Sequence, residues 1–230
     1  MSSSTTSSPA LSVAPSAISM AEARGIALGL AAAAIWGAYL AMAKAGVSAG
    51  LAPSDIAFIR YGVAGLVMLP WLVAKGFRTC GGVGWGRALV LSMLVGPVFI
   101  LIGVGGYRFA PLAHGAVMQP AALTILSIVL AALVLKDRPT VARLVGVAGM
   151  LAGLAIIAGP GLFKGNSLTP IGDVMFVIAG GMWAVFTLLT KLWKVAPLPV
   201  TAAVSVLSAA VYVPSFLAIE GVDRLAHAAP

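Results

Sequence analysis

The sequence predicts an all-α membrane protein, a polytopic bundle of about seven transmembrane helices. Its 230 residues are 61% hydrophobic and only 9% charged, with a mean hydropathy of +1.09. A water-soluble domain has about a quarter charged residues, so this composition indicates an integral membrane protein. The apolar residues also gather into runs of roughly 20, the length that spans a bilayer. Each run must be a helix, because a lone segment in lipid has to satisfy its own backbone groups.

The chain opens with residues 1–24, which we expect to form a disordered tail because this Ser-, Thr-, Ala- and Pro-rich stretch buries little apolar surface. Seven apolar segments follow, and prolines or small polar residues mark their ends. The expected helices are 25–46, 55–74, 88–106, 112–135, 139–159, 170–191 and 199–219. Inside the third of them, Pro97 follows Gly96, which predicts a kink.

The basic residues between these segments predict the orientation of the chain. Nine lie on the side of the N-terminus: Arg24, Lys75, Arg78, Arg87, Lys136, Arg138, Arg143, Lys191 and Lys194. Three lie on the other side: Arg108, Lys164 and Arg224. Cytoplasmic loops are enriched in Lys and Arg, so we expect a cytoplasmic N-terminus in a plasma or inner membrane.

A nine-residue pattern occurs twice in the chain. Trp36–Lys44 reads WGAYLAMAK, and Trp183–Lys191, at an offset of 147 residues, reads WAVFTLLTK. We therefore expect a first five-helix repeat at 25–160 and an incomplete second repeat of two helices at 161–230. A repeat with an odd number of spans is followed by a copy in the opposite orientation, which is the inverted construction common in secondary transporters.

Five stretches of sequence carry a family resemblance: WGAYLAMAK, PSDIAFIRYGVAGLVML, YRFAPLAHGAVMQP, KDRPTVARLVGVAGMLAGLAIIAG and GDVMFVIAGGMWAVFTLLTK. In their order and spacing, over about residues 25–219, they resemble the EamA family of the drug/metabolite transporter superfamily. The resemblance implies ten helices, arranged as two inverted five-helix repeats around a central substrate cavity. Against that pattern the chain is expected to be C-terminally truncated, because helices eight to ten have no counterpart in it.

Polar and aromatic side chains within the apolar spans are the candidates for binding a solute. Arg60 is a charge inside the second span, and Trp36–Tyr39 and Trp183–Phe186 would be symmetry mates across a central site. The full candidate set is Trp36, Tyr39, Arg60, His114, Gln119, Trp183 and Phe186.

Each candidate also has a structural interpretation. Arg60 could reach the headgroups or pair with Asp55, and His114 could serve at the membrane interface. Gln119 could satisfy backbone freed by Pro120, and the aromatic pairs could be ordinary packing. Three glycines of the fifth helix, Gly146, Gly149 and Gly153, are expected to form a packing face. No carboxylate lies deep in a predicted span, which gives carboxylate-based proton coupling little support.

The sequence thus favours an EamA-like secondary transporter that moves a small metabolite or drug-like solute by alternating access. The alternative is a truncated or degenerate transporter fragment without transport of its own. A retinal protein is disfavoured because the last span has no lysine. No phosphate-binding loop, metal-ligand cluster or catalytic triad can be identified, so we expect no enzyme, cofactor or metal. The expected partners are the lipid bilayer and a small-molecule substrate but no nucleic acid, and a homo-oligomer or a complementing chain could supply the missing helices.

Overall fold

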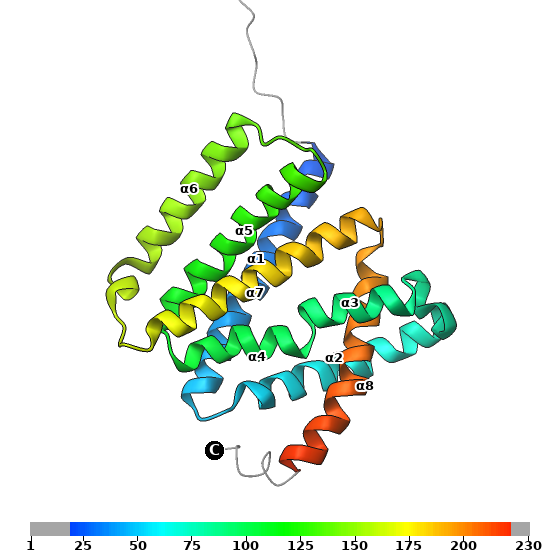
Figure 1. The fold of residues 1–230 in the computed structure, drawn as a ribbon. Coiled ribbons are helices and arrows are strands. Elements are labelled where there is room, and N and C mark those ends of the chain that lie inside the picture. Colours follow the sequence, from blue (N-terminus) through cyan, green and yellow to red (C-terminus); the bar gives the residue numbers. More distant parts are fainter. Residues whose placement is uncertain (1–18, 222–230) are drawn as a thin grey trace, which may run out of the picture. The chain divides into compact units, whose positions relative to one another are not determined.

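The structure, a computed structural model, describes residues 19–221 apart from the side chains at positions 157, 158 and 162. Every regular element among these residues is a helix, which confirms the predicted all-α class. The α-helices are α1 (Met20–Ser48), α2 (Pro53–Gly76), α3 (Trp85–Val95), α4 (Pro97–Gly105), α5 (Leu112–Val134), α6 (Val141–Ala158), α7 (Thr169–Leu192) and α8 (Pro197–Glu220). Short 3₁₀ helices are η1 (Phe77–Gly82), η2 (Gly106–Arg108) and η3 (Gly159–Phe163) (Figure 1). The chain forms two compact units, Met1–Tyr39 and Leu40–Pro230, and each is described by itself.

In the first unit, α1 begins at Met20 and not at residue 25. The predicted tail of residues 1–24 is therefore helical at its end, while its residues 1–18 lie outside the described part of the chain. A capping box explains the early start. The N–H of Ser19 donates to Glu22 Oε2 (2.8 Å), and the N–H of Glu22 donates to Ser19 Oγ (3.2 Å).

The third predicted helix is broken into α3 and α4. Gly96 stands between them in an extended conformation (φ −84°, ψ −150°), and α4 starts directly at Pro97. Pro97 has no N–H to donate and its ring crowds the preceding turn, so the helix cannot continue through it. The Tyr61 hydroxyl of α2 donates to the carbonyl of Val95 at the break. The kink predicted at this position is confirmed, and it is a full interruption.

In the second unit, α2 and α8 pack along each other in opposite directions. Near the start of α2, the Tyr212 hydroxyl of α8 donates to the carbonyl of Ser54 (3.2 Å). Further along α2, Gly65 lies directly against Ala209, which comes earlier in α8. Beyond that contact, Leu72 belongs to a buried apolar core with Val200 at the start of α8. Four crossings, α3–α4, α5, α6 and α7, separate α2 from α8 along the chain. Two spans separated by an even number of crossings run in opposite directions, as these two do.

Helices α5 and α7 also pack closely, but they run in the same direction (Figure 1). A Cβ added to Gly172, early in α7, would lie 2.7 Å from the Cβ of Ala110, which precedes α5. A Cβ added to Gly180, further along α7, would lie 2.8 Å from the Cβ of Ala122, further along α5. The chain must therefore cross back between them, and α6 is the only helix long enough in the segment that joins them.

This return crossing identifies α6 as a seventh span. Among residues 19–221, six apolar helical stretches are long enough to cross a membrane, and α6 is a shorter apolar helix. Its 18 residues extend about 27 Å at ~1.5 Å per residue, close to the ~30 Å hydrocarbon core. The polytopic bundle of about seven helices is therefore confirmed. The division into repeats at residues 160 and 161 stays a prediction.

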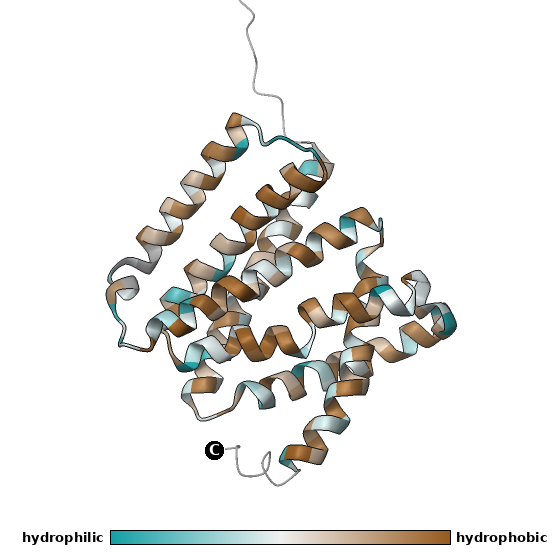
Figure 2. Cartoon of the chain, viewed as in Figure 1, coloured by the Kyte–Doolittle hydropathy of each residue, from teal (hydrophilic) through white to brown (hydrophobic). Residues whose placement is uncertain are grey.

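Many large apolar side chains of the helices are exposed. Figure 2 shows that apolar residues recur along α5, α6 and α8. Leu133, Val145 and Val211, for example, are each at least 60% exposed. A soluble monomer rarely exposes so much contiguous apolar surface, so these faces meet lipid.

The prediction that the glycines of α6 form a packing face is wrong for the described part of the chain. A Cβ at Gly146, Gly149 or Gly153 would meet no heavy atom within 4 Å. The glycines that bring helices into close contact are instead Gly65 on α2 and Gly172 and Gly180 on α7. Glycine spacing alone predicts a small-residue face but not whether a neighbouring helix covers it.

Candidate functional site

The predicted site residues fall on four helices. Two of them, Trp36 and Tyr39, belong to the first unit, where both are half-buried while most residues around them on α1 are exposed. Their predicted place opposite the second aromatic pair stays a prediction. The other candidates lie in the second unit: Arg60 on α2, His114 and Gln119 on α5, and Trp183 and Phe186 on α7.

His114 pairs with a carboxylate inside the bundle. Its Nδ1 lies 2.8 Å from Oδ1 of Asp173, and the exposed fractions of the two side chains are 7% and 24%. The parallel packing of α5 and α7 places the imidazole between the helices, against the first turns of α7. Its depth at the membrane interface stays a prediction. The buried Nε2 of the same ring has no hydrogen-bond partner among the described residues. That nitrogen is thus left to bind another polar group.

Lys44 also turns into the protein. Its Nζ donates to the carbonyl of Tyr107 (2.9 Å) and lies 6.0 Å from the centre of the Tyr107 ring. The structure thus gives this last residue of the WGAYLAMAK pattern a partner in η2, the short helix that follows α4. An ammonium group has three donors, so two remain for other ligands.

The Tyr107 ring connects these two polar contacts. It packs against Phe176 of α7, with ring centres 4.9 Å apart, and it lies directly over Gly115, the neighbour of His114. We call Lys44, Tyr107, His114 and Asp173 the polar cluster. All four lie near helix ends on the side opposite to the basic loops, and they come from α1, η2, α5 and α7.

Gln119 and Arg60 lie apart from the polar cluster along their helices. Gln119 is 5% exposed, and its Oε1 points towards Gly103 of α4, where an added Cβ would be 3.9 Å away. Arg60 is half-buried, and its Cζ lies 5.7 Å from the centre of the Tyr61 ring. Asp55, the partner considered for Arg60, accepts a hydrogen bond from the N–H of Ala52 (2.7 Å) and so caps α2.

Trp183 and Phe186 belong to a chain of aromatic rings. The Trp183 ring lies 5.2 Å from that of Phe99 on α4 and 5.7 Å from that of Phe186. Both pack against the buried core between α3 and α8. The packing interpretation of this pair therefore has direct support.

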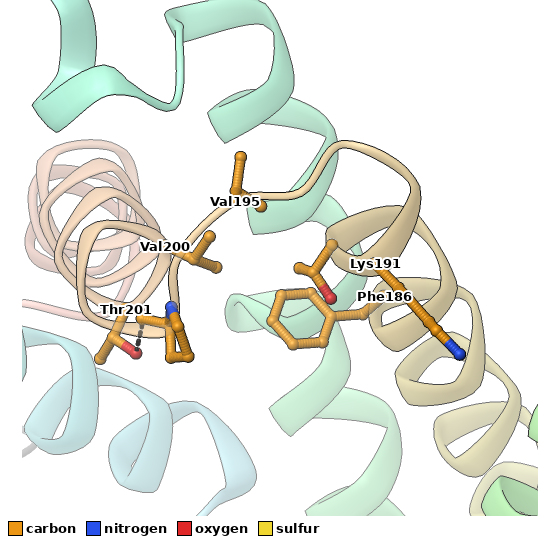
Figure 3. Close-up of a pocket in the computed structure, with 7 residues that line it drawn as sticks. Phe186, Lys191, Val195, Val200 and Thr201 are labelled. Atoms are coloured by element: carbon orange, nitrogen blue, oxygen red, sulfur yellow. Dashed lines mark hydrogen bonds between the residues drawn. The ribbon is translucent and has the colours of Figure 1, made fainter.

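Phe186 also lines a cavity of about 350 Å³ between the end of α7 and the start of α8 (Figure 3). Its ring points into this space towards Val200 and Thr201, while the ammonium of Lys191 points away from it. The Thr201 hydroxyl is bonded to the carbonyl of Pro197 (3.0 Å). The hydroxyl of Thr190, also in the wall, is bonded to the carbonyl of Thr187 (3.0 Å). With mostly apolar walls and both hydroxyls already paired, this cavity suits an apolar group more than a polar one.

Sequence reasoning missed Asp173 and Tyr107 as site residues. Asp173 lies one turn into α7, where its charge suits the helix dipole and its side chain can also face a neighbouring helix. His114 likewise lies near the start of α5, so both side chains are on the same side of the bundle, which is the signal in the sequence that the two could meet. Among the described residues, no three His, Cys, Asp or Glu side chains gather as a metal-binding group.

Comparison with known proteins agrees with the resemblance noted from the sequence. The model of the EamA-like transporter family matches residues 23–159. A curated protein of Archaeoglobus fulgidus, described as an uncharacterized transporter, is 28% identical over 159 residues, which cover 67% of this chain and 53% of that protein. The chain thus spans about half the length of the curated relative it matches. No solved structure is similar enough to match.

Proposed function

The chain belongs to the EamA-like transporter family, and from that premise we propose that it is a secondary transporter that moves a small metabolite or drug-like solute by alternating access. The family and the apolar helices make it an integral multi-pass membrane protein, and they point to a transporter and not to an enzyme. The finer statement, a small solute carried by alternating access, needs support from this chain's own residues.

The observation that carries the proposal is the polar cluster. Charged and polar side chains are expensive in an apolar bundle and normally mark a substrate or ion pathway. Lys44, His114 and Asp173 bring an ammonium, an imidazole and a carboxylate to one end of the second unit. Lys44 keeps two donors and His114 one ring nitrogen for other groups. Together they could bind a small solute that carries both acceptors and donors.

The broken helix supports the alternating-access part of the proposal. Discontinuous helices near the midplane are a recurring feature of secondary transporters. Gly96 divides the α3–α4 span close to its middle, since the apolar stretch runs from Trp85 to Arg108. A break there lets the two halves move separately while each keeps its own hydrogen bonds. We also propose that the basic loops face the cytoplasm, which places the polar cluster at the outer end.

The first test is solute flux into proteoliposomes that contain the purified 230-residue protein, measured with amino acids, nucleosides and cationic drugs. We expect uptake above that of empty vesicles for one of these classes. Lys44→Ala should lower that uptake about tenfold or more, because it removes a half-buried charge from the polar cluster. Lys164→Ala is the matched control, since Lys164 is an exposed lysine on the same side.

Two results would count against the proposal. Uptake by Lys44→Ala equal to that of the unaltered protein would remove the polar cluster from the solute path. Uptake by the unaltered protein no higher than in empty vesicles would favour the second candidate, a fragment without transport of its own. That candidate rests on one observation, the coverage of only about half of the curated relative.

A further inference from the structure

The break between α3 and α4 leaves backbone oxygen atoms without their helical partners. In an unbroken helix the N–H of residue 97 would bond the carbonyl of Met93, but Pro97 has no N–H. The Gly96 N–H bonds the carbonyl of Ser92 (2.7 Å), and the Tyr61 hydroxyl bonds that of Val95. The carbonyl oxygen of Met93, at the end of α3, therefore lacks its helical N–H partner in the middle of a membrane span.

Two buried serine hydroxyls of α3 and α8 have no hydrogen-bond partner among the described residues. Ser92, on the last turn of α3, is 7% exposed, and Ser208, in the middle of α8, is 2% exposed. Neither Oγ has a hydrogen-bond partner among the described residues. The Ser208 Oγ is aimed at the break, because it lies 2.8 Å from the position that a Cβ on Gly96 would occupy.

Other hydroxyls on α8 do find partners, so the helix itself does not prevent the Ser208 hydroxyl from forming a hydrogen bond. Serine and threonine in a helix commonly bond a carbonyl one turn back. Ser215 does so with the carbonyl of Val211 (2.7 Å), and Thr201 does so with that of Pro197 (3.0 Å). Ser208 lies between these two residues on α8 and does not. A buried hydroxyl without a partner lowers the stability of the folded state. Two such hydroxyls near one helix break therefore indicate that a ligand binds there.

We propose that the Gly96 break is a binding site for a monovalent cation, Na⁺, held by the hydroxyl oxygens of Ser92 and Ser208 and by the free carbonyl oxygen at the end of α3. Hydroxyl and carbonyl oxygens replace the hydration shell of an alkali cation. Unwound carbonyls and half-helix C-terminal ends coordinate Na⁺ in secondary transporters. The C-terminal end of α3 also carries the negative end of the helix dipole.

The positive charges around the break make an anion the main alternative to Na⁺ as the ligand of this site. The positive end of α4 begins at the same break, and Arg60 stacks over Tyr61, whose hydroxyl reaches Val95. However, α4 opens with a proline that offers no N–H, so the donors on that side are fewer than at an ordinary helix start. The hydroxyl and carbonyl oxygens at the break favour the cation, and the experiment must separate cation from anion.

The test is the melting temperature of the purified protein in detergent, at equal ionic strength, in sodium chloride, sodium gluconate, potassium chloride and choline chloride. We expect both sodium salts to raise the melting temperature above the choline value, by roughly 5–10 °C at a hundred times the Kd. Ser208→Ala and Ser92→Ala should each lose most of this sodium-dependent rise. Ser215→Ala, which removes a bonded hydroxyl from the same helix as Ser208, should keep it.

The outcomes that overturn the site are distinct. A rise that follows chloride would make it an anion site, and an equal melting temperature in all four salts would leave the hydroxyls without a ligand. Equal sodium shifts in Ser208→Ala and the unaltered protein would place the cation elsewhere. In choline chloride, Ser208→Ala should melt no lower than the unaltered protein, because it only removes an unpaired hydroxyl.

Cation binding at the break does not depend on transport, whereas its use as the coupling ion rests on the proposed function. A sodium shift without any flux would therefore leave the site standing and count against the transporter. If flux is the same with and without a sodium gradient, and sodium does not raise the melting temperature, the transporter stands and the cation site does not.

Discussion

Gly180→Ala should unfold at a clearly lower temperature than the unaltered protein. The new Cβ would lie 2.5 Å from the carbonyl oxygen of Gln119, 2.8 Å from the Cβ of Ala122 and 2.9 Å from the N of Leu123. None of these atoms is the end of a flexible side chain, so the backbones of α5 and α7 must move apart at this contact. Overpacking of this kind costs roughly 1–3 kcal/mol. Thermal unfolding in detergent, followed by circular dichroism, measures the loss.

The matched control is Gly149→Ala on α6. An added Cβ there meets no heavy atom within 4 Å, and alanine is favoured over glycine within a helix by about 1 kcal/mol. The same chemical change should therefore lower stability at Gly180 and leave it unchanged or raise it at Gly149. Equal losses at both positions would show that α6 packs against a partner through its glycines, as the glycine spacing first suggested.

The sequence was sufficient to place the helices because the bilayer fixes their length. The expected 55–74 and 170–191 became Pro53–Gly76 and Thr169–Leu192, with prolines near each start. The start of α1 was missed although its signal is present in the sequence. Ser19 and Glu22 form a capping box that outweighs the low helix propensity of the stretch before it.

Which polar groups meet could not be predicted, because helix packing decides it. His114 and Asp173 are 59 residues apart, and only the parallel approach of α5 and α7 joins them. The sequence directed attention to Trp183 and Phe186, which the structure packs with Phe99. The repeated lysine also has two different outcomes, since Lys44 bonds Tyr107 while Lys191 points away from the cavity beside it (Figure 3).

The second large effect should come from separating His114 and Asp173. Removing the carboxylate leaves a buried imidazole nitrogen unpaired, and an unsatisfied buried polar group costs about 1–3 kcal/mol. We therefore expect Asp173→Ala and His114→Ala each to destabilise the protein, and the double variant to lose less than the sum of the two. The interaction free energy from this double-mutant cycle should be about 1–3 kcal/mol in thermal or denaturant unfolding.

A second ion pair of the same chain supplies the control. Arg143 and Asp137 lie 3.7 Å apart at the start of α6, and their side chains are 45% and 53% exposed. Because solvent screens an exposed pair, its cycle should give no more than about 0.5 kcal/mol. If the His114–Asp173 cycle gave as little, the pair would not stabilise the fold. Loss of flux in Asp173→Ala would then have to come from direct contact with the solute, so the two cycles separate a role in stability from a role in binding.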